Sequence, residues 1–152
     1  SKKNLYTDNC ILNSVLNIKY SAAQVADIKI ESNIFVPKYM NIDYGDMGVL
    51  FGNLLDNAIE ANQGVDRKKR WINVSVKYEE HILIINIKNS KIRGSRRKKK
   101  GYLNHGIGLN SVKQIVEKFN GIVEVQDFGE MYEVSAILYG ICDDKDLGKS
   151  VL

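Results

Sequence analysis

The chain has 152 residues, of which 44% are hydrophobic and 26% charged, as is ordinary for one globular domain with a sizeable core. It has no apolar run as long as a membrane span and no recognisable signal peptide. The chain is not disulfide-dense, which favours a reducing cytoplasm. Two cysteines, Cys10 and Cys142, and two histidines, His81 and His105, match no metal-ligand spacing, which argues against a zinc site and a disulfide scaffold.

The net charge of +4 is unevenly distributed along the chain. Seven lysines and arginines and no acidic residue lie between Ser90 and His105, and without them the net charge would be −3. A second basic run covers residues 67–70. Such runs are most often solvated loops, and the sharper alternatives are binding of nucleic acid or of a phosphorylated small molecule. No aromatic residue is interleaved with either run, so stacking on single-stranded nucleic acid is unsupported.

The first predicted element is an amphipathic helix that Thr7 or Asp8 would cap and that runs to about Ala26. Residues 27–31 alternate as in a β-strand, and Pro37 then breaks the chain. The core stripe of this first helix is expected at Ile11, Val15, Ile18, Ala22 and Val25.

The second predicted helix starts near Asp46, ends around residues 63–64 and carries two asparagines. Asn53 and Asn57 are four residues apart, which places both amides on one helix face, one turn apart, beside an apolar stripe. Because asparagine lowers helix propensity and a half-buried amide needs partners, the pair indicates either satisfied structural amides or a site for a polar ligand.

Two β-hairpins follow the asparagine helix. Residues 71–77 and 81–88 form the first, with Glu79-Glu80 as the turn, and residues 121–127 and 131–138 form the second. The strand at 81–88 is almost wholly apolar, which predicts that both of its faces are covered. The sequence therefore predicts an α+β fold, a two-layer α/β sandwich with helices on one face of a mixed, mostly antiparallel sheet. Its regions are a tail with the first helix at 1–26, the main domain at 27–140 and a poorly packed polar tail at 141–152.

A glycine-containing segment, His105-Gly106-Ile107-Gly108-Leu109, directly precedes a predicted amphipathic helix over residues 110–119. Glycines at these positions permit a tight turn or a close approach to a ligand. The N–H groups and positive dipole end of a helix that starts here would suit a phosphate. A lone Gly-x-Gly is most often only a turn, but here it follows a basic loop and accompanies the paired asparagines.

The order of these motifs resembles the ATP-binding domain shared by gyrase, heat-shock chaperone, histidine kinase and mismatch-repair ATPases, the GHKL or Bergerat-type fold. The resemblance covers residues 27–138 and is closest to sensor histidine kinases of the accessory-gene-regulator, quorum-sensing type, through Asn104-His105-Gly106-Ile107-Gly108-Leu109-Asn110-Ser111-Val112-Lys113. It implies that Asn57 ligates a magnesium ion that bridges to the ATP phosphates. Asn53 stands where gyrase-type members carry a catalytic glutamate. An amide is a poor general base, so slow ATP hydrolysis is expected.

The resemblance also implies roles for the residues around the basic loop. The segment from His105 to Leu109, with Gly106, Ile107 and Gly108, would be the second glycine box at the phosphates. His105 would donate to a phosphate or remain an exposed loop imidazole. The loop before it would be the ATP lid, whose candidate phosphate contacts are Arg96, Arg97, Lys98, Lys99 and Lys100.

The first glycine box departs from the family pattern. The family commonly has Asp-x-Gly-x-Gly here, whereas this chain has Asn89-Ser90-Lys91, without the two glycines. The Asn89 side-chain oxygen can still accept the adenine amino proton, although Asn-Ser is also an ordinary turn signal.

These features predict the catalytic domain of a two-component sensor kinase that binds ATP and Mg²⁺ and phosphorylates a histidine on another domain. No histidine precedes His81, so this chain alone should not autophosphorylate. Its expected partners are a phosphoacceptor helical domain and, through it, a response regulator, in a membrane-anchored bacterial protein that dimerises while this fragment is monomeric. The alternatives are an anti-sigma-type serine kinase, a gyrase-like ATPase and a non-catalytic scaffold, with nucleic-acid binding the weakest.

Overall fold

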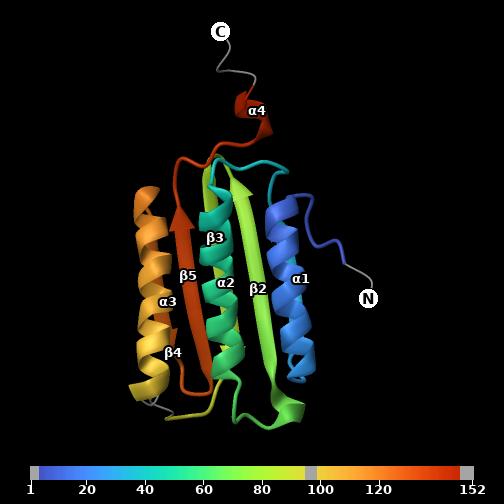
Figure 1. Cartoon of the computed structure of the whole chain (residues 1–152), viewed down its shortest axis with the longest axis vertical. Helices are drawn as coiled ribbons and strands as arrows, with labels where there is room; N and C mark the ends of the chain where they lie inside the picture. The colour runs from blue at the N-terminus through green and yellow to red at the C-terminus, as the bar shows by residue number, and fades with distance from the viewer. Residues whose placement is uncertain (1–3, 95–98, 148–152) are drawn as a thin grey trace.

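The computed structural model describes the backbone of residues 4–94 and 99–147, and their side chains except those of 99–107 and 147. Three long helices, α1 to α3, lie side by side over one face of a single β-sheet (Figure 1). The elements are α1 (Cys10–Val25), β1 (Lys29–Phe35), α2 (Tyr44–Ala61), the 3-10 helix η1 (Arg67–Lys69), β2 (Trp71–Glu79), β3 (Ile82–Ser90), α3 (Lys99–Lys118), β4 (Ile122–Asp127), β5 (Met131–Leu138) and α4 (Asp144–Leu147).

The sheet has the strand order β1-β2-β3-β5-β4. β1 and β2 are parallel, with α2 in the connection between them, and every other pairing is antiparallel. Alternate residues of β2, β3 and β5 are buried beneath the helices, and together with the inner faces of α1, α2 and α3 they form the core. The predicted two-layer α+β sandwich with a mixed, mostly antiparallel sheet is confirmed.

The register of α1 differs from the prediction. Asn9, rather than Thr7 or Asp8, caps the helix, and its side chain accepts a hydrogen bond from the Leu12 backbone N–H at 3.1 Å. Ile18 and Val25, expected in the core, are 66% and 84% exposed. The residues that are buried instead are Leu12, Leu16, Tyr20 and Ala23.

The two apolar stripes of α1 lie next to each other on the helix, so periodicity alone could not choose between them. The observed stripe brings the Tyr20 hydroxyl to 2.7 Å from Ser32 Oγ on β1, which gives a buried polar atom a partner. Burial raises the pKa of Tyr20 to about 12, with the Ser32 hydrogen bond acting in the opposite direction.

Two further predictions about β3 are wrong. The helices of the described residues cover only one face of the sheet, and Ile84 of the apolar strand β3 is 40% exposed on the other face. The β2–β3 turn is Glu80-His81, both with positive φ, one residue later than expected. The polar tail is packed where it begins, because Ile141 is fully buried and the backbone N–H of Cys142 donates to Asn41 Oδ1 at 2.8 Å.

In the described ranges, no helix combines the length and the hydropathy that crossing a lipid bilayer would require.

Gly121, before β4, can be tested as a position that tolerates no side chain. A Cβ there would lie 2.0 Å from the Ile137 carbonyl oxygen, which is backbone of β5 and has little freedom to move. We expect Gly121→Ala to lower the free energy of unfolding in urea by about 3 kcal/mol. The matched control is Gly48→Ala in α2, where a Cβ meets nothing within 4 Å and alanine should be neutral or stabilising. Equal stability of the two variants would contradict this packing.

Candidate functional site

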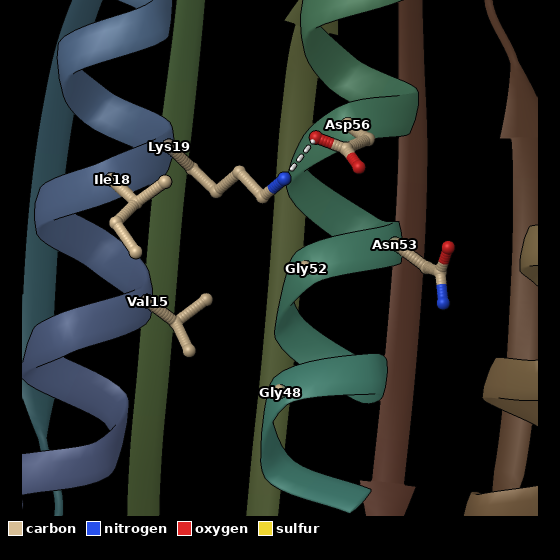
Figure 2. Close-up of a pocket in the computed structure, with 7 residues that line it drawn as sticks. All are labelled: Val15, Ile18, Lys19, Gly48, Gly52, Asn53 and Asp56. Carbon is tan, nitrogen blue, oxygen red and sulfur yellow. Dashed lines mark ion pairs between the residues drawn. The ribbon is translucent and has the colours of Figure 1, made fainter. Parts of the chain in front are cut away.

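The two asparagines identified in the sequence lie on α2, one turn apart. Asn53 Nδ2 donates to the Val49 carbonyl of its own helix at 2.8 Å, and the side chain points away from α1 (Figure 2). Asn57 is only 4% exposed. The amides therefore lie on the side of α2 toward α3, as a polar strip beside the core.

Helices α2 and α3 are antiparallel neighbours (Figure 1). Lys118, near the end of α3, forms an ion pair with Asp46, in the first turn of α2, at 3.0 Å. Nearer the middle of the two helices, α3 packs closely on α2, because an added Cβ on Gly108 would lie 3.2 Å from Asn53 Oδ1. Asn57 is one turn beyond Asn53 on α2. Because α3 runs in the opposite direction, Asn57 lies toward the part of α3 that precedes Gly108.

The structure corrects the prediction of a tight glycine turn before a helix at Asn110. α3 begins at Lys99 and continues through Gly106 and Gly108, so both glycines have helical backbone. Glycine in a helix costs only about 1 kcal/mol relative to alanine, and the residues around the pair include good helix formers. At Gly108 the missing side chain serves the close packing of α3 on Asn53.

Several predicted contacts of the basic loop fall outside the described residues. Arg96, Arg97 and Lys98 are not described, and Lys99 and Lys100 are described only as the first backbone residues of α3. The side chains of His105 and Ile107 also lie outside the described set. Leu109 is half-buried on α3.

Asn89 is buried at the end of β3. It follows Ile87 by two residues and so lies on the same, helix-covered face of the strand, with 1% of its surface exposed. Asn89 Nδ2 donates to the Ser90 carbonyl oxygen at 3.0 Å. In the described part of the chain, Asn89 Oδ1 is buried and accepts no hydrogen bond. A buried acceptor in this state costs about 1–3 kcal/mol, which makes it a candidate ligand-binding atom.

Sequence reasoning missed a polar network next to Asn89. Ser90 Oγ donates to Asn62 Oδ1 and accepts from the Trp71 backbone N–H at 2.9 Å. Asn62 is fully buried and donates to the Ala58 carbonyl oxygen at 3.0 Å. The network joins the end of α2 to the start of β2 and the end of β3. Asn62 and Ser90 are 28 residues apart, and no spacing in the sequence pairs them.

A separate groove lies between α1 and α2, with a volume of about 310 Å³. Figure 2 shows the Lys19–Asp56 ion pair, 2.8 Å long, spanning the two helices. Asn53 borders the groove but points toward α3, so the groove and the amide strip lie on different sides of α2. The lining residues are Val15, Ile18, Lys19, Gly48, Gly52, Asn53 and Asp56.

Residues 42–138 match the family model described as the GHKL domain, a stretch that covers more than half of the chain. This chain belongs to the GHKL family. A Bacillus subtilis (strain 168) protein described as "Probable C4-dicarboxylate sensor kinase" is 32% identical over 95 residues, which cover 56% of this chain and 18% of that protein. The chain thus spans less than a fifth of the length of this curated relative.

Solved structures of histidine kinases share the fold. The nucleotide-free catalytic domain of histidine kinase ThkA superposes with a TM-score of 0.67 at 15% identity, over 87% of this chain and 91% of that one. Acinetobacter baumannii histidine kinase AdeS gives a TM-score of 0.63 at 16% identity, over 90% of this chain and 66% of that one. Full-length ShkA in complex with AMPPNP gives 0.65 at 14% identity, over 90% of this chain and 31% of that one. The GHKL domain described here therefore has the architecture of a histidine kinase catalytic domain.

The Asn62–Ser90 network can be tested by removing one hydroxyl. Ser90→Ala leaves the fully buried Asn62 oxygen and the Trp71 N–H without their partner, so the free energy of unfolding in urea should fall by about 1–3 kcal/mol. Ser75→Ala, at a half-exposed position on β2, is the matched control and should change it by less than about 0.5 kcal/mol. A Ser90→Ala variant as stable as the control would show that the network contributes nothing to folding.

Proposed function

We propose that this chain is the ATP-binding catalytic domain of a two-component sensor histidine kinase. The observation that carries the proposal is the buried Asn89 Oδ1, an acceptor with no donor in the described part of the chain. It lies at the end of β3, the position at which related domains hold the adenine amino group. An adenine N–H donor would satisfy this oxygen and remove the cost of its burial.

Asn57 is the residue that we assign to Mg²⁺. Its side-chain oxygen is the hard ligand that Mg²⁺ prefers, and a single protein ligand fits an ion that keeps several waters and binds phosphates. When bound, the ion would neutralise phosphate charge during transfer. Asn53 offers an amide where hydrolytic relatives carry a carboxylate, which favours conserving the γ-phosphate for transfer over hydrolysis.

Phosphate binding by the Gly106–Gly108 segment requires a change in α3. In the structure described here, the backbone N–H groups of this segment belong to helix interior, where they hydrogen-bond to carbonyls of the preceding turn. We propose that nucleotide binding uncoils α3 from Lys99 to about Gly108, so that the helix begins near Asn110. The N–H groups of its new first turn would then meet the phosphates.

The partners follow from this role. The sequence contains no histidine before His81, and His81 lies in the β2–β3 turn, so the phosphoacceptor is assigned to a helical domain outside this chain. A response regulator would take the phosphoryl group from that domain. We further assign the chain to the peptide-sensing, accessory-gene-regulator type of kinase in a dimeric, membrane-anchored parent protein, on the strength of the Asn104–Lys113 tract.

Two observations favour a second candidate, a non-catalytic module of the same fold. The first glycine box lacks both glycines, and the second glycine box is helical in this structure. Measurement of nucleotide binding decides between the two candidates.

Asn57 and Asn89 can be tested by calorimetric titration with a non-hydrolysable ATP analogue. Asn57→Ala should lower the affinity at least tenfold in the presence of magnesium and have little effect without it. Asn89→Leu should weaken binding with or without magnesium, and Asn89→Asp should restore it and sharpen the preference for adenine over guanine. Asn73→Ala, half-exposed on β2, is the control. Absence of binding by the unaltered chain would put the non-catalytic module first.

The uncoiling of α3 can be tested through Gly101, which lies in the same helical segment but outside the glycine pair. Gly101→Ala stabilises the helical form by about 1 kcal/mol, so it should weaken nucleotide binding about fivefold without touching the phosphates. Backbone NMR shifts of residues 99–108 should move from helical to non-helical values when the analogue binds. Helical shifts retained at saturation would refute the transition.

A further inference from the structure

His81, Cys142 and Asp146 meet at the end of the sheet away from the start of α3. His81 lies in the turn between β2 and β3, Cys142 follows the last strand, and Asp146 lies on α4 at the top of Figure 1. The imidazole nitrogen, thiol sulfur and carboxylate oxygen all lie within 4.8 Å of one another. We propose that these three side chains form a zinc-binding site.

The distances suit tetrahedral coordination. Two ligands at about 2.0–2.1 Å from a tetrahedral zinc ion are separated by about 3.3 Å. His81 Nδ1 and Asp146 Oδ2 are 3.4 Å apart. In the described residues, the Cys142 thiol makes only a long contact of 3.9 Å, to the Gly140 carbonyl oxygen, so no strong hydrogen bond opposes its rotation toward the other two ligands.

The backbone that carries the ligands is held by hydrogen bonds independent of any metal. The Ile141 N–H donates to the His81 carbonyl oxygen at 2.9 Å, which fixes the turn against the C-terminal segment. Asn41 accepts from the Cys142 N–H at 2.8 Å and donates its own N–H to the Cys142 carbonyl oxygen at 3.3 Å. A site with this support requires little ordering when the ion binds.

The ligand types and the local charge select zinc. Thiolate, imidazole and carboxylate together are typical of zinc and unsuited to magnesium or calcium, which prefer oxygen ligands alone. Residues 143–146 contain three aspartates and one lysine, so the surroundings attract a dication. Asp146 Oδ2 also accepts from the Asp143 N–H at 2.9 Å, an outer contact that orients the carboxylate.

Binding would exchange protons for the metal. The Cys142 thiol releases its proton to solvent. His81 Nδ1, which donates its proton to the Ile141 carbonyl oxygen at 3.1 Å in this structure, must give up that hydrogen bond, so that the neutral ring carries its proton on Nε2 and turns Nδ1 toward the ion. Three protein ligands leave a fourth position for water or for a donor from another molecule. The bound ion would connect the C-terminal segment to the β2–β3 turn.

The sequence alone argued against zinc, because the histidine and the cysteine are far apart in the chain and match no ligand spacing. Strand β3 and the segment after β5 bring them together at one end of the sheet. This inference concerns a site separate from the amide strip on α2 and does not depend on nucleotide binding.

The test uses the full chain, reduced and stripped of metal with a chelator, and cobalt(II) as a spectroscopic probe for zinc. We expect a thiolate-to-cobalt charge-transfer band with the visible absorption of tetrahedral cobalt, both removed by one equivalent of zinc. Cys142→Ser should abolish the charge-transfer band, and Cys10→Ser, which alters the other cysteine, should retain it. His81→Ala and Asp146→Asn should each weaken zinc binding at least tenfold in a chelator competition.

Asp144→Asn, at an exposed position on α4, is the matched control for Asp146→Asn and should leave zinc affinity unchanged. Equal losses in these two variants would mean that acidic residues attract the ion without ligating it. An unaltered chain with no charge-transfer band, or one whose band survives Cys142→Ser, would overturn the proposal. Circular dichroism of every variant establishes that it is folded before the metal is added.

Discussion

The domain depends on helix α2. This helix must bury one of its faces in the core while the neighbouring face presents two amide side chains. Leu50, Phe51, Leu54 and Leu55 of this helix are almost fully buried. Asn53 and Asn57 lie beside them, and because the helix is packed between α1 and α3, the amides are held at fixed positions. A polar strip on a rigid, close-packed element is suited to positioning a ligand, since ordering the side chains requires little further loss of entropy.

Strand β3 connects the two proposed sites. Successive side chains of β3 point to opposite faces of the sheet, so Leu83, Ile85 and Ile87 lie under the helices. Asn89 continues this series, which is why an amide is buried at the end of an apolar strand. At its other end the strand begins directly after His81. The proposed nucleotide site and the proposed zinc site thus lie at opposite ends of one rigid strand, and neither shares a residue with the other.

The glycine pair of α3 is compatible with two backbone conformations, a helix and a tight turn. Glycine permits the helical backbone described here and equally permits the turn that the family motif implies, because its cost in a helix is only about 1 kcal/mol. At Gly108 the absence of a side chain also lets α3 approach Asn53. A helix that is weakened at two positions and preceded by a basic run is a segment in which phosphate binding can compete with helical hydrogen bonds.

The sequence by itself determined the order of elements, the two hairpins and the spacing of the α2 amides, because these depend on periodicity and turn chemistry within short segments. It did not determine which of two stripes of α1 is buried, since that depends on packing against the rest of the core, including the Tyr20–Ser32 contact across to β1. Nor did it show the Asn62–Ser90 network or the meeting of His81 with Cys142. Those contacts join residues far apart in the chain, and only the packing of the sheet and helices brings them within bonding distance.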